Sequence, residues 1–424
     1  MKYSPRYQLF PDDQQQEQLN WTVDVVRQLY NDALKRFNDV PESDGTLNQR
    51  VRSVRDELPS MKDWWDDLND VYSKVLQMVA RRVSDNLDRL KEKKKNGRKV
   101  GMLKWKSPRE YRSLTYNQSG FELKNTSDQT VLSLSKIGEM PIHLHRDIPD
   151  DARVKQVTVK QEKTGEWYAT FGIETETDAP KKPALDEIDR EDMVGIDVGI
   201  IKYAHDTDST MVGSLDLEDE YERLEREQRA LSRKEDGSQN WHEQRRRVAR
   251  IYARIVRKRR DFLHKLSNYY TREYDLVAVE DLDVHRMMQL PSNSRNRASA
   301  SWRTFIDFLE YKCDREGTHF VKVGPEGTTQ ECAECGVEVE KELWVREHSC
   351  PTCGFETDRD ENAAYNVLQR GLSELGLGHA EVTPAETALS TSTTGGSSTV
   401  VDAKCVVETG SPTLKERTAS AVSE

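Results

Sequence analysis

The sequence lacks any long apolar run. Of its 424 residues, 35% are hydrophobic and 33% are charged, and no stretch approaches the roughly 20 apolar residues that a membrane helix needs. The first segment, MKYSPRYQLFPDD, also lacks the apolar centre of a signal peptide. These absences predict a cytoplasmic protein with no membrane partner. The length predicts two or three domains, because it exceeds what one simple core usually holds.

A disulfide framework is absent as well. Of the six cysteines, Cys313 and Cys405 stand alone. The other four form two C-x-x-C pairs in the pattern C-x2-C-x14-C-x2-C: Cys332, Cys335, Cys350 and Cys353. In a cytoplasmic chain such pairs favour a metal over disulfides. A glycine follows each pair and lets the backbone turn sharply, so that amides point at the thiolates. We therefore favour four thiolates around one structural Zn²⁺ over a redox pair or incidental cysteines.

A positive net charge is the third absence. The formal net charge of −11 argues against nucleic acid for the chain as a whole. An acidic chain with basic segments fits a high-salt cytoplasm as well as it fits an ordinary acidic protein. Two segments, residues 91–106 and 244–262, nevertheless concentrate Lys and Arg. A charge run is usually only a solvated face, but interleaved aromatic side chains and the arginine bias make phosphate contact about equally favoured. The predicted nucleic-acid contacts are Lys93, Lys94, Lys95, Lys104, Lys106, Arg246, Arg250 and Arg254.

Hydrophobic periodicity predicts a helical region followed by a strand-rich region. Apolar residues recur every three or four positions over residues 12–37 and about 65–90, which predicts two helices. From about 121 to 177 apolar and polar residues alternate, which predicts a small antiparallel barrel or sheet. The charged stretch 178–192 carries two prolines and is interpreted as a linker.

The remainder of the chain mixes strands and helices. The expected elements are a strand–turn–strand at 193–205, a long charged helical region at 217–272, a strand at 274–284 and a helix at 300–315. A break near residues 236–237, which would make the helical region a hairpin, stays open. From about residue 379 the chain is rich in Ser, Thr and Gly, which predicts a disordered tail.

Two carboxylates fall within or at the end of apolar strand patterns. Asp197 lies in VGIDVG, and Glu280 ends the run LVAVE. An isolated carboxylate in a buried strand costs on the order of several kcal/mol unless it is paired or metal-bound. For either residue alone, a capping or surface role is the commoner explanation. A third acid at the helix start in DRDENAAYN changes the balance, because three converging carboxylates would hold two divalent cations that clamp a phosphodiester.

The helix start itself offers two aspartates with different roles. Asp358 is placed to cap the helix by accepting an amide N–H from residue 360 or 361. Glu361, at the third helical position, would reach back as in a capping box. Asp360 has no such local task and is therefore free to bind a metal, and the positive helix end favours its ionised form.

Five motifs follow one another in a characteristic order: GIDVGI, VAVEDL, TTQECAECG, CPTCG and DRDENAAYN. In this order they resemble the TnpB family, transposon-encoded RNA-guided nucleases related to the type V CRISPR effectors. The match is specific over about residues 193–371, while the N-terminal half agrees more loosely. The resemblance implies an α+β multidomain fold, with a helical recognition lobe in a small β-barrel and then an RNase H-like, RuvC-like α/β domain with an inserted zinc ribbon.

The resemblance also implies domain boundaries. The expected parts are residues 1–12 as the first barrel strand, 13–115 as the helical recognition domain, 116–180 as the rest of the barrel, 181–192 as a linker, 193–327 as the first part of the RuvC-like domain, 328–357 as the zinc ribbon, 358–378 as the last RuvC-like helix and 379–424 as the tail.

Activity and site residues follow from the same resemblance. Asp197, Glu280 and Asp360 match the three catalytic acids, which would hold two Mg²⁺ ions, and the four paired cysteines match the ligands of one Zn²⁺. The implied protein is prokaryotic and encoded by an insertion sequence. Its partners would be a transposon-derived guide RNA and double-stranded target DNA, cut beside a short flanking motif by two-metal hydrolysis.

Two alternatives stay open. The first is a regulator that binds DNA through RNA guidance or the zinc ribbon and no longer cuts. The second is a RuvC-like nuclease that works without a guide. No motif residue is lost, which argues against the non-cleaving relatives.

Overall fold

The computed structural model describes residues 1–40, 46–117, 119–126, 129–149, 151–282, 301–342, 345–377 and 400–401. It divides into two compact units, which we call unit 1 (Met1–Asp178 and Arg245–Arg250) and unit 2 (Ala179–Gln244 and Ile251–Glu424). In the described part of the chain, no helix has the length and apolar character needed to cross a membrane. The predicted tail lies outside the described residues, apart from the short strand β16 (Val400–Val401).

The helices of unit 1 lie between two strands of its sheet in the sequence. They are α1 (Asp13–Asp39), α2 (Leu47–Asp56), α3 (Leu58–Met61), α4 (Asp67–Asp70) and α5 (Ser73–Lys95). Asp12 caps α1 and forms a capping box with Gln15. The helix predicted from about residue 65 is interrupted, because Val71 takes an extended conformation and the long helix α5 begins only after Tyr72.

The sheet of unit 1 is entirely antiparallel. Its strands are β1 (Lys2–Tyr3), β2 (Arg6–Leu9), β3 (Ser113–Asn117), β4 (Phe121–Asn125), β5 (Thr130–Leu134), β6 (Gly138–His143), β7 (Arg153–Gln161) and β8 (Trp167–Glu174). They run in the order β3-β7-β8-β2-β6-β5-β4, with β1 paired to β8, and the pairing between described strands does not close into a ring. Residues of β8 alternate between buried and half-buried, as a one-faced sheet requires.

Unit 2 is built on a mixed sheet. Its strands are β9 (Met193–Val198), β10 (Lys202–Asp206), β11 (Met211–Gly213), β12 (Leu276–Glu280), β13 (His319–Val323) and β16, in the order β13-β12-β9-β10-β11-β16. The first three are antiparallel neighbours, whereas β12 and β13 run parallel to β9. The helices are α6 (Glu218–Ser232), α7 (Gln239–Glu273), α10 (Trp302–Glu316) and α11 (Arg359–Glu374).

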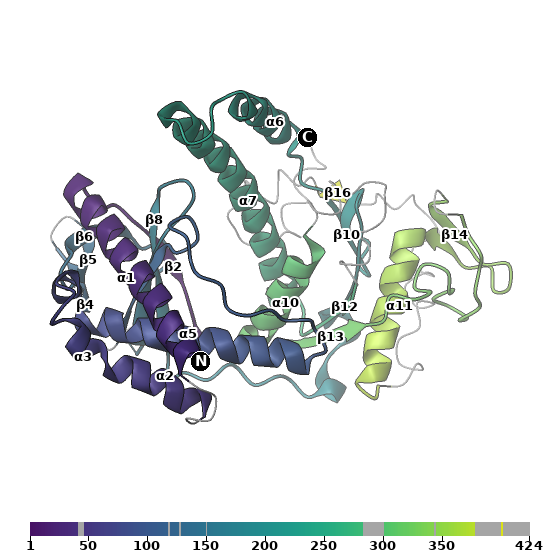
Figure 1. Ribbon diagram of the computed structural model, residues 1–424. Helices are drawn as coiled ribbons and strands as arrows, with labels where there is room; N and C mark the ends of the chain where they lie inside the picture. The colour runs from purple at the N-terminus through teal and green to yellow at the C-terminus, as the bar shows by residue number, and fades with distance from the viewer. Residues whose placement is uncertain are drawn as a thin grey trace. The chain divides into compact units, whose positions relative to one another are not determined.

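Helices cover both faces of this sheet, with α7 and α10 on one side and α11 on the other (Figure 1). Val194, Ile196 and Val198 of β9 pack against α7 and α10. Met193 of the same strand, with Leu276 and Ala278 of β12, packs against α11 instead. Side chains on a strand alternate between the two faces of the sheet. The face occupied by each remaining residue of β9 and β12 follows from this pattern.

The segment expected as a linker carries some structure of its own. It contains two short 3₁₀ turns, η2 (Leu185–Glu187) and η3 (Arg190–Asp192). Between them Ile188 is 8% exposed and joins the cluster of apolar side chains beneath α11. Part of this segment therefore belongs to the core of unit 2.

Candidate metal centres and nucleic-acid-binding groove

Strand pairing brings Asp197 and Glu280 side by side. β9 and β12 run parallel with Gly195 opposite Ala278, so Asp197 and Glu280 stand two positions further along each strand. Gly195 and Ala278 both face α11, and residues two apart on a strand share a face. The two carboxylates therefore lie on the face that α11 covers, at the ends of neighbouring strands.

Helix α11 brings the third acid to the same edge. A Cβ at Gly195 would overlap the carbonyl oxygen of Ala364, so the backbone of α11 rests directly on β9. Asp360 precedes Ala364 by one helical turn and shares its face. Burial, followed by the nearby charges of Glu280 and Asp360, raises the pKa of Asp197 well above its usual value. The three predicted catalytic acids thus lie within electrostatic range of one another.

Glu280 is held in place by the chain that follows β13. Its side chain is 5% exposed and accepts a hydrogen bond from Thr328 Oγ1 at 2.5 Å. Burial raises the pKa of Glu280, while Thr328 and Arg370 oppose this shift. Two of the three acids are therefore destabilised in their ionised form, which is a common condition at sites that use or bind charge.

Three cationic side chains that the sequence analysis did not single out surround Asp360. The Arg359 guanidinium lies 3.1 Å from its carboxylate, Arg346 Nη1 lies at 3.6 Å and Lys202 Nζ at 3.8 Å. Arg359 belongs to the DRDEN motif and directly precedes Asp360, so the sequence alone could have indicated that it lies beside this acid. Arg346 and Lys202 reach Asp360 from distant parts of the sequence, and no local sequence pattern indicated these contacts.

The helix start differs from the expectation in one respect. Asp358 caps α11 by accepting the amide N–H of Asp360 at 2.8 Å, as predicted. Glu361 does not complete a capping box. It accepts hydrogen bonds from the hydroxyls of Thr357 and Ser209 instead, because the turn after β10 places Ser209 next to the helix. The capping-box prediction for Glu361 was therefore wrong.

A buried histidine, also missed, stands beside the acids. His205 of β10 is paired directly with Asp197 of β9 in the antiparallel ladder, so both side chains share a face of the sheet. Its Nδ1 atom lies 3.5 Å from Asp358 Oδ1. Although burial opposes it, His205 and Lys202 hold the pKa of Asp358 well below its usual range. Only the β9–β10 register brings this histidine to the acids.

The four paired cysteines converge as their spacing predicted. Sulfur atoms of Cys332 and Cys353, and of Cys335 and Cys350, lie 3.6 Å apart, and all four lie within 4.8 Å of one another. A disulfide would need about 2.05 Å. Tetrahedral bonds of about 2.3 Å to one zinc ion place sulfurs roughly 3.8 Å apart. The donor set and its size therefore fit one zinc ion.

The backbone around the thiols forms two similar turns. After each pair, a glycine with positive φ donates its amide to the first cysteine's carbonyl: Gly336 to Cys332 and Gly354 to Cys350. The amides of Cys353 and Thr352 lower the pKa of Cys350 to about 6, which favours the thiolate that metals bind. A two-stranded hairpin, β14 (Glu347–Ser349) and β15 (Glu356–Asp358), completes this small module.

Two buried asparagines tie the cysteine module to α11. Asn362 accepts the amide of Ala333 at 3.0 Å and donates to the carbonyl of Glu331 at 2.7 Å. Asn366 donates to the carbonyls of Thr328 and Glu331. These bonds fix the first turns of α11, and with them Asp360, to the chain that enters the module. The motif DRDENAAYN holds both asparagines, although sequence reasoning gave them no role.

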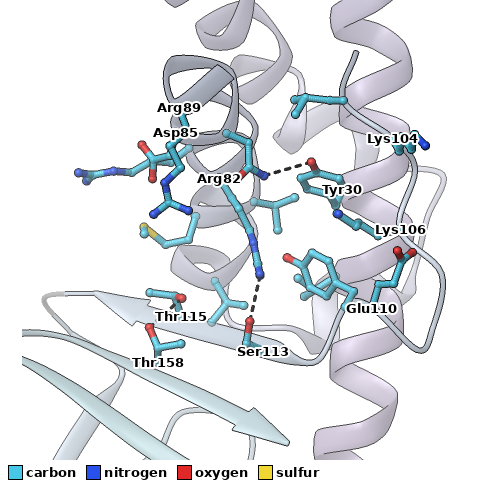
Figure 2. Close-up of a pocket in the computed structure, with 18 of the residues that line it drawn as sticks. Tyr30, Arg82, Asp85, Arg89, Lys104, Lys106, Glu110, Ser113, Thr115 and Thr158 are labelled. Atoms are coloured by element: carbon cyan, nitrogen blue, oxygen red, sulfur yellow. Dashed lines mark hydrogen bonds between the residues drawn. The ribbon is translucent and has the colours of Figure 1, made fainter. Parts of the chain in front are cut away.

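A basic cavity of about 630 Å³ lies within unit 1. Figure 2 shows Arg89 and Asp85 on one wall and Lys104 and Lys106 on the other. Arg82 donates to Ser113 Oγ at 3.0 Å. The charged side chains that line the cavity are six basic and two acidic ones: Arg81, Arg82, Arg89, Lys93, Lys104, Lys106, Asp85 and Glu110.

The predicted nucleic-acid contacts are distributed unevenly over the structure. Lys93, Lys104 and Lys106 line this cavity, whereas Lys94 and Lys95 are exposed in the last turn of α5. On α7, Arg246, Arg250 and Arg254 are all exposed. Arg254 lies 3.6 Å from Glu220 of α6, so part of its charge is already compensated.

Comparison with known proteins identifies the class. The profile of the IS605 OrfB family, described as "Probable transposase", matches residues 171–290. The "Cas12f1-like, TNB domain" profile matches residues 302–367, and a helix-turn-helix profile of the OrfB family matches residues 1–44. These matches place the chain in the class of IS605 OrfB proteins that carry a Cas12f1-like TNB domain.

Relatives over the whole length identify the family. A Streptomyces pristinaespiralis protein named "Putative RNA-guided DNA endonuclease" is 32% identical over 89% of this chain and 91% of its own. The Escherichia coli protein "Putative RNA-guided DNA endonuclease InsQ" is 27% identical over 88% of this chain and 93% of its own. The chain therefore belongs to the TnpB/IS605 OrfB family.

Solved structures agree on the fold. The chain in "Cryo-EM structure of the Cas12f1-sgRNA-target DNA complex" is 14% identical, with a TM-score of 0.53 over 82% of this chain and 81% of that chain. The chain in "Structure of the mini-RNA-guided endonuclease CRISPR-Cas_phi3" is 9% identical, with a TM-score of 0.50 over 91% and 94%. At these identities the likeness is one of fold alone, and it supports a mixed α+β multidomain architecture.

Proposed function

We propose that the protein is an RNA-guided DNA endonuclease that cuts target DNA beside a short flanking motif. The observation that carries this proposal is the convergence of Asp197, Glu280 and Asp360 from three elements onto one edge of the unit 2 sheet. Three neighbouring carboxylates, two of which have a pKa raised by burial, form a donor set for hard divalent cations. The names of the two full-length relatives point to the same activity.

Each acid would have a defined task at this centre. Asp197, Glu280 and Asp360 would hold two Mg²⁺ ions, which when bound supply an activated water and stabilise the leaving oxygen of a phosphodiester. Thr328 orients the Glu280 carboxylate through its hydrogen bond. Arg359 and Arg346 hold Asp360 and leave positive charge at the edge where a phosphate would approach. The order of antiparallel and parallel strands in unit 2 supports the RNase H-like, RuvC-like assignment.

The remaining parts would bind nucleic acid or support the fold. The basic cavity of unit 1 is suited to a phosphate backbone, since its basic side chains outnumber its acidic ones. The transposon-derived guide RNA would pair with the target strand, and the protein would read the flanking motif and the shape of the heteroduplex. One Zn²⁺ held by the four cysteines would fix the module that enters α11.

The test is a cleavage reaction with RNA recovered from the purified protein. That RNA would be sequenced, its guide portion re-directed, and a matching double-stranded DNA library offered with Mg²⁺. We expect cleavage that follows the new guide and selects one flanking motif. Binding of the matching DNA without any cut would instead indicate a non-cleaving regulator. Cleavage that ignores the guide would indicate a nuclease without RNA guidance.

A further inference from the structure

Two side chains next to the proposed catalytic acids, His205 and Asp358, have no part in the proposed cleavage chemistry. Nδ1 of His205 and one carboxylate oxygen each of Asp358 and Asp360 lie within 4.8 Å of one another. His205 comes from β10, and the two aspartates come from the start of α11. The group is therefore built from a different strand than the pair formed by Asp197 and Glu280, and it shares only Asp360 with the proposed nuclease centre.

The histidine has an unsatisfied nitrogen. His205 is 2% exposed, and its Nδ1 atom makes no hydrogen bond to any described residue. The Asp358 oxygen at 3.5 Å is too distant for a good bond. A buried polar atom without a partner costs about 1–3 kcal/mol, so its position calls for a reason. An imidazole nitrogen directed at two carboxylates is a typical donor set for a divalent cation.

A cation already bridges the same carboxylates. Lys202 Nζ lies 2.8 Å from Asp358 Oδ2 and 3.8 Å from Asp360 Oδ2. The side chain of Lys202 is 25% exposed, so its ammonium group has a route to solvent. A purely structural ion pair would account for Lys202 and Asp358, but it leaves Nδ1 of His205 without a hydrogen bond of good length.

We propose that His205, Asp358 and Asp360 form a further divalent-cation site that prefers a transition-metal ion such as Mn²⁺, Co²⁺ or Zn²⁺ over Mg²⁺. Imidazole is a good ligand for such ions, whereas Mg²⁺ prefers oxygen donors. In a tetrahedral site, bonds of about 2.1 Å place neighbouring donors about 3.4 Å apart. The three donors therefore need to approach by up to about 1.4 Å, with Lys202 turned to solvent.

The site stands on metal binding alone, so it remains testable whether or not the chain cuts DNA. The probe is Mn²⁺, added to the full chain with its zinc retained and without nucleic acid. Pulsed electron paramagnetic resonance detects a nitrogen bound to Mn²⁺ by its nuclear modulation. We expect the modulation of one imidazole in the parent protein. Selective labelling with ¹⁵N-histidine, which leaves the fold unchanged, should convert the ¹⁴N modulation to that of ¹⁵N.

Variants assign the nitrogen to one residue. His205→Gln should remove the modulation, whereas Asp197→Asn, which leaves all three donors in place, should keep it. His319→Gln is the matched control, because the His319 ring nitrogen is 2.8 Å from the Pro183 carbonyl, away from the acids. Modulation that survives His205→Gln, or that His319→Gln removes, would refute the assignment.

Lys202→Gln separates a metal site from an ion-pair network in a second way. If the ammonium competes with the metal, its removal should tighten Mn²⁺ binding about tenfold, measured as free Mn²⁺ in a titration. If the group is only an ion-pair network, the variant should lose stability and bind Mn²⁺ no better. The absence of histidine modulation at saturating Mn²⁺ in both the parent and Lys202→Gln would overturn the proposal.

Discussion

The four cysteines and the three predicted catalytic acids of unit 2 form clusters that are suited to metal ions and are built in opposite ways. The four thiols belong to one segment of 22 residues from Cys332 to Cys353 and face one another in two pairs 3.6 Å apart. The three acids come from β9, β12 and α11, and burial raises the pKa of both Asp197 and Glu280. Four thiols complete the ligand set of one zinc ion and leave no position for a substrate, whereas burial and the charges of Glu280 and Asp360 disfavour the ionised form of Asp197 in the acid cluster.

This difference indicates different uses of a bound ion. When all ligands of a structural metal come from the protein, the free energy of metal binding stabilises the fold. A buried carboxylate cluster is costly until a cation binds, and such perturbed acids are common at functional sites. The asparagines of α11 connect the two clusters, because they bond the entry to the cysteine module onto the helix that carries Asp360.

The largest expected effect comes from Asp197→Asn. Cleavage should fall on the order of 10³-fold or more, because a metal ligand is lost. At the same time the Mg²⁺-free, zinc-containing protein should gain about 0.5–2 kcal/mol in unfolding free energy, because the cost of burying a charge and its repulsion by Glu280 and Asp360 are both relieved. Guided cleavage assays and thermal unfolding measure the two effects. Glu374→Gln, an exposed acid at the far end of α11, should change neither.

The pH dependence of that gain has a defined sign. The folded pKa of Asp197 is raised above its usual value of 3.8. Above pH 3.8 the unfolded carboxyl loses its proton while the folded one keeps it, so the parent loses stability with rising pH up to the folded pKa. The advantage of Asp197→Asn should therefore grow with pH above about 4. An advantage that shrinks with rising pH would contradict a raised pKa of Asp197 in the folded protein.

Cys350→Ser, in the cysteine cluster, should lower the stability of the protein, whereas Asp197→Asn should raise it. Zinc content should fall from about one ion per chain, for a single four-ligand site, and the cysteine module should lose stability. Cleavage should fall roughly 10- to 100-fold because outer supports of a metal site typically matter by this much. Cys313→Ala, at a buried cysteine outside the cluster, should keep the zinc. Parent protein purified without chelators yet free of zinc would contradict the interpretation of the four-cysteine cluster as a zinc site.

Gly195→Ala should disturb the acids and leave the thiols intact. The added Cβ would overlap the Ala364 carbonyl and the Leu368 side chain, so α11 must move away from β9. We expect a loss of about 1–3 kcal/mol in stability and at least tenfold slower cleavage, with unchanged zinc content. Gly101→Ala is the matched control, since its Cβ would meet nothing within 4 Å. Full activity of Gly195→Ala would show that the contact of α11 with β9 does not position the acids.

The smallest effect is expected outside both clusters. Replacing Lys93, Lys94 and Lys95 by Ala should weaken nucleic-acid binding a few-fold for all sequences and flatten its salt dependence, since each neutralised phosphate releases counterions. Binding isotherms at several salt concentrations measure the slope. Lys155→Ala, which removes a lysine paired with Glu174 at 2.6 Å, is the control. An unchanged slope would mean that the three lysines form only a solvated face.

Features that depend on residues close together in the sequence could be predicted from the sequence. The cap of α1 by Asp12 and the cap of α11 by Asp358 are local, because a capping side chain bonds an amide two or three residues away. The four cysteines converge for the same reason, since each pair sits on one tight turn. The start of α5 was misplaced, because Val71 is apolar at the right spacing but extended in conformation.

By itself, then, the sequence determined the local geometry: the strand and helix periodicity, the two caps, the thiol turns and the motif order that marks the family. The tertiary structure alone decided which distant side chains share a site. The register of β9 with β10 brings His205 to the acids, and the turn after β10 draws Glu361 away from its expected capping role. Lys202 and Arg346 reach Asp360 from separate elements. The physical reason is that strand register and helix packing depend on pairings far apart in the chain, where a shift of one residue moves every side chain to the opposite face.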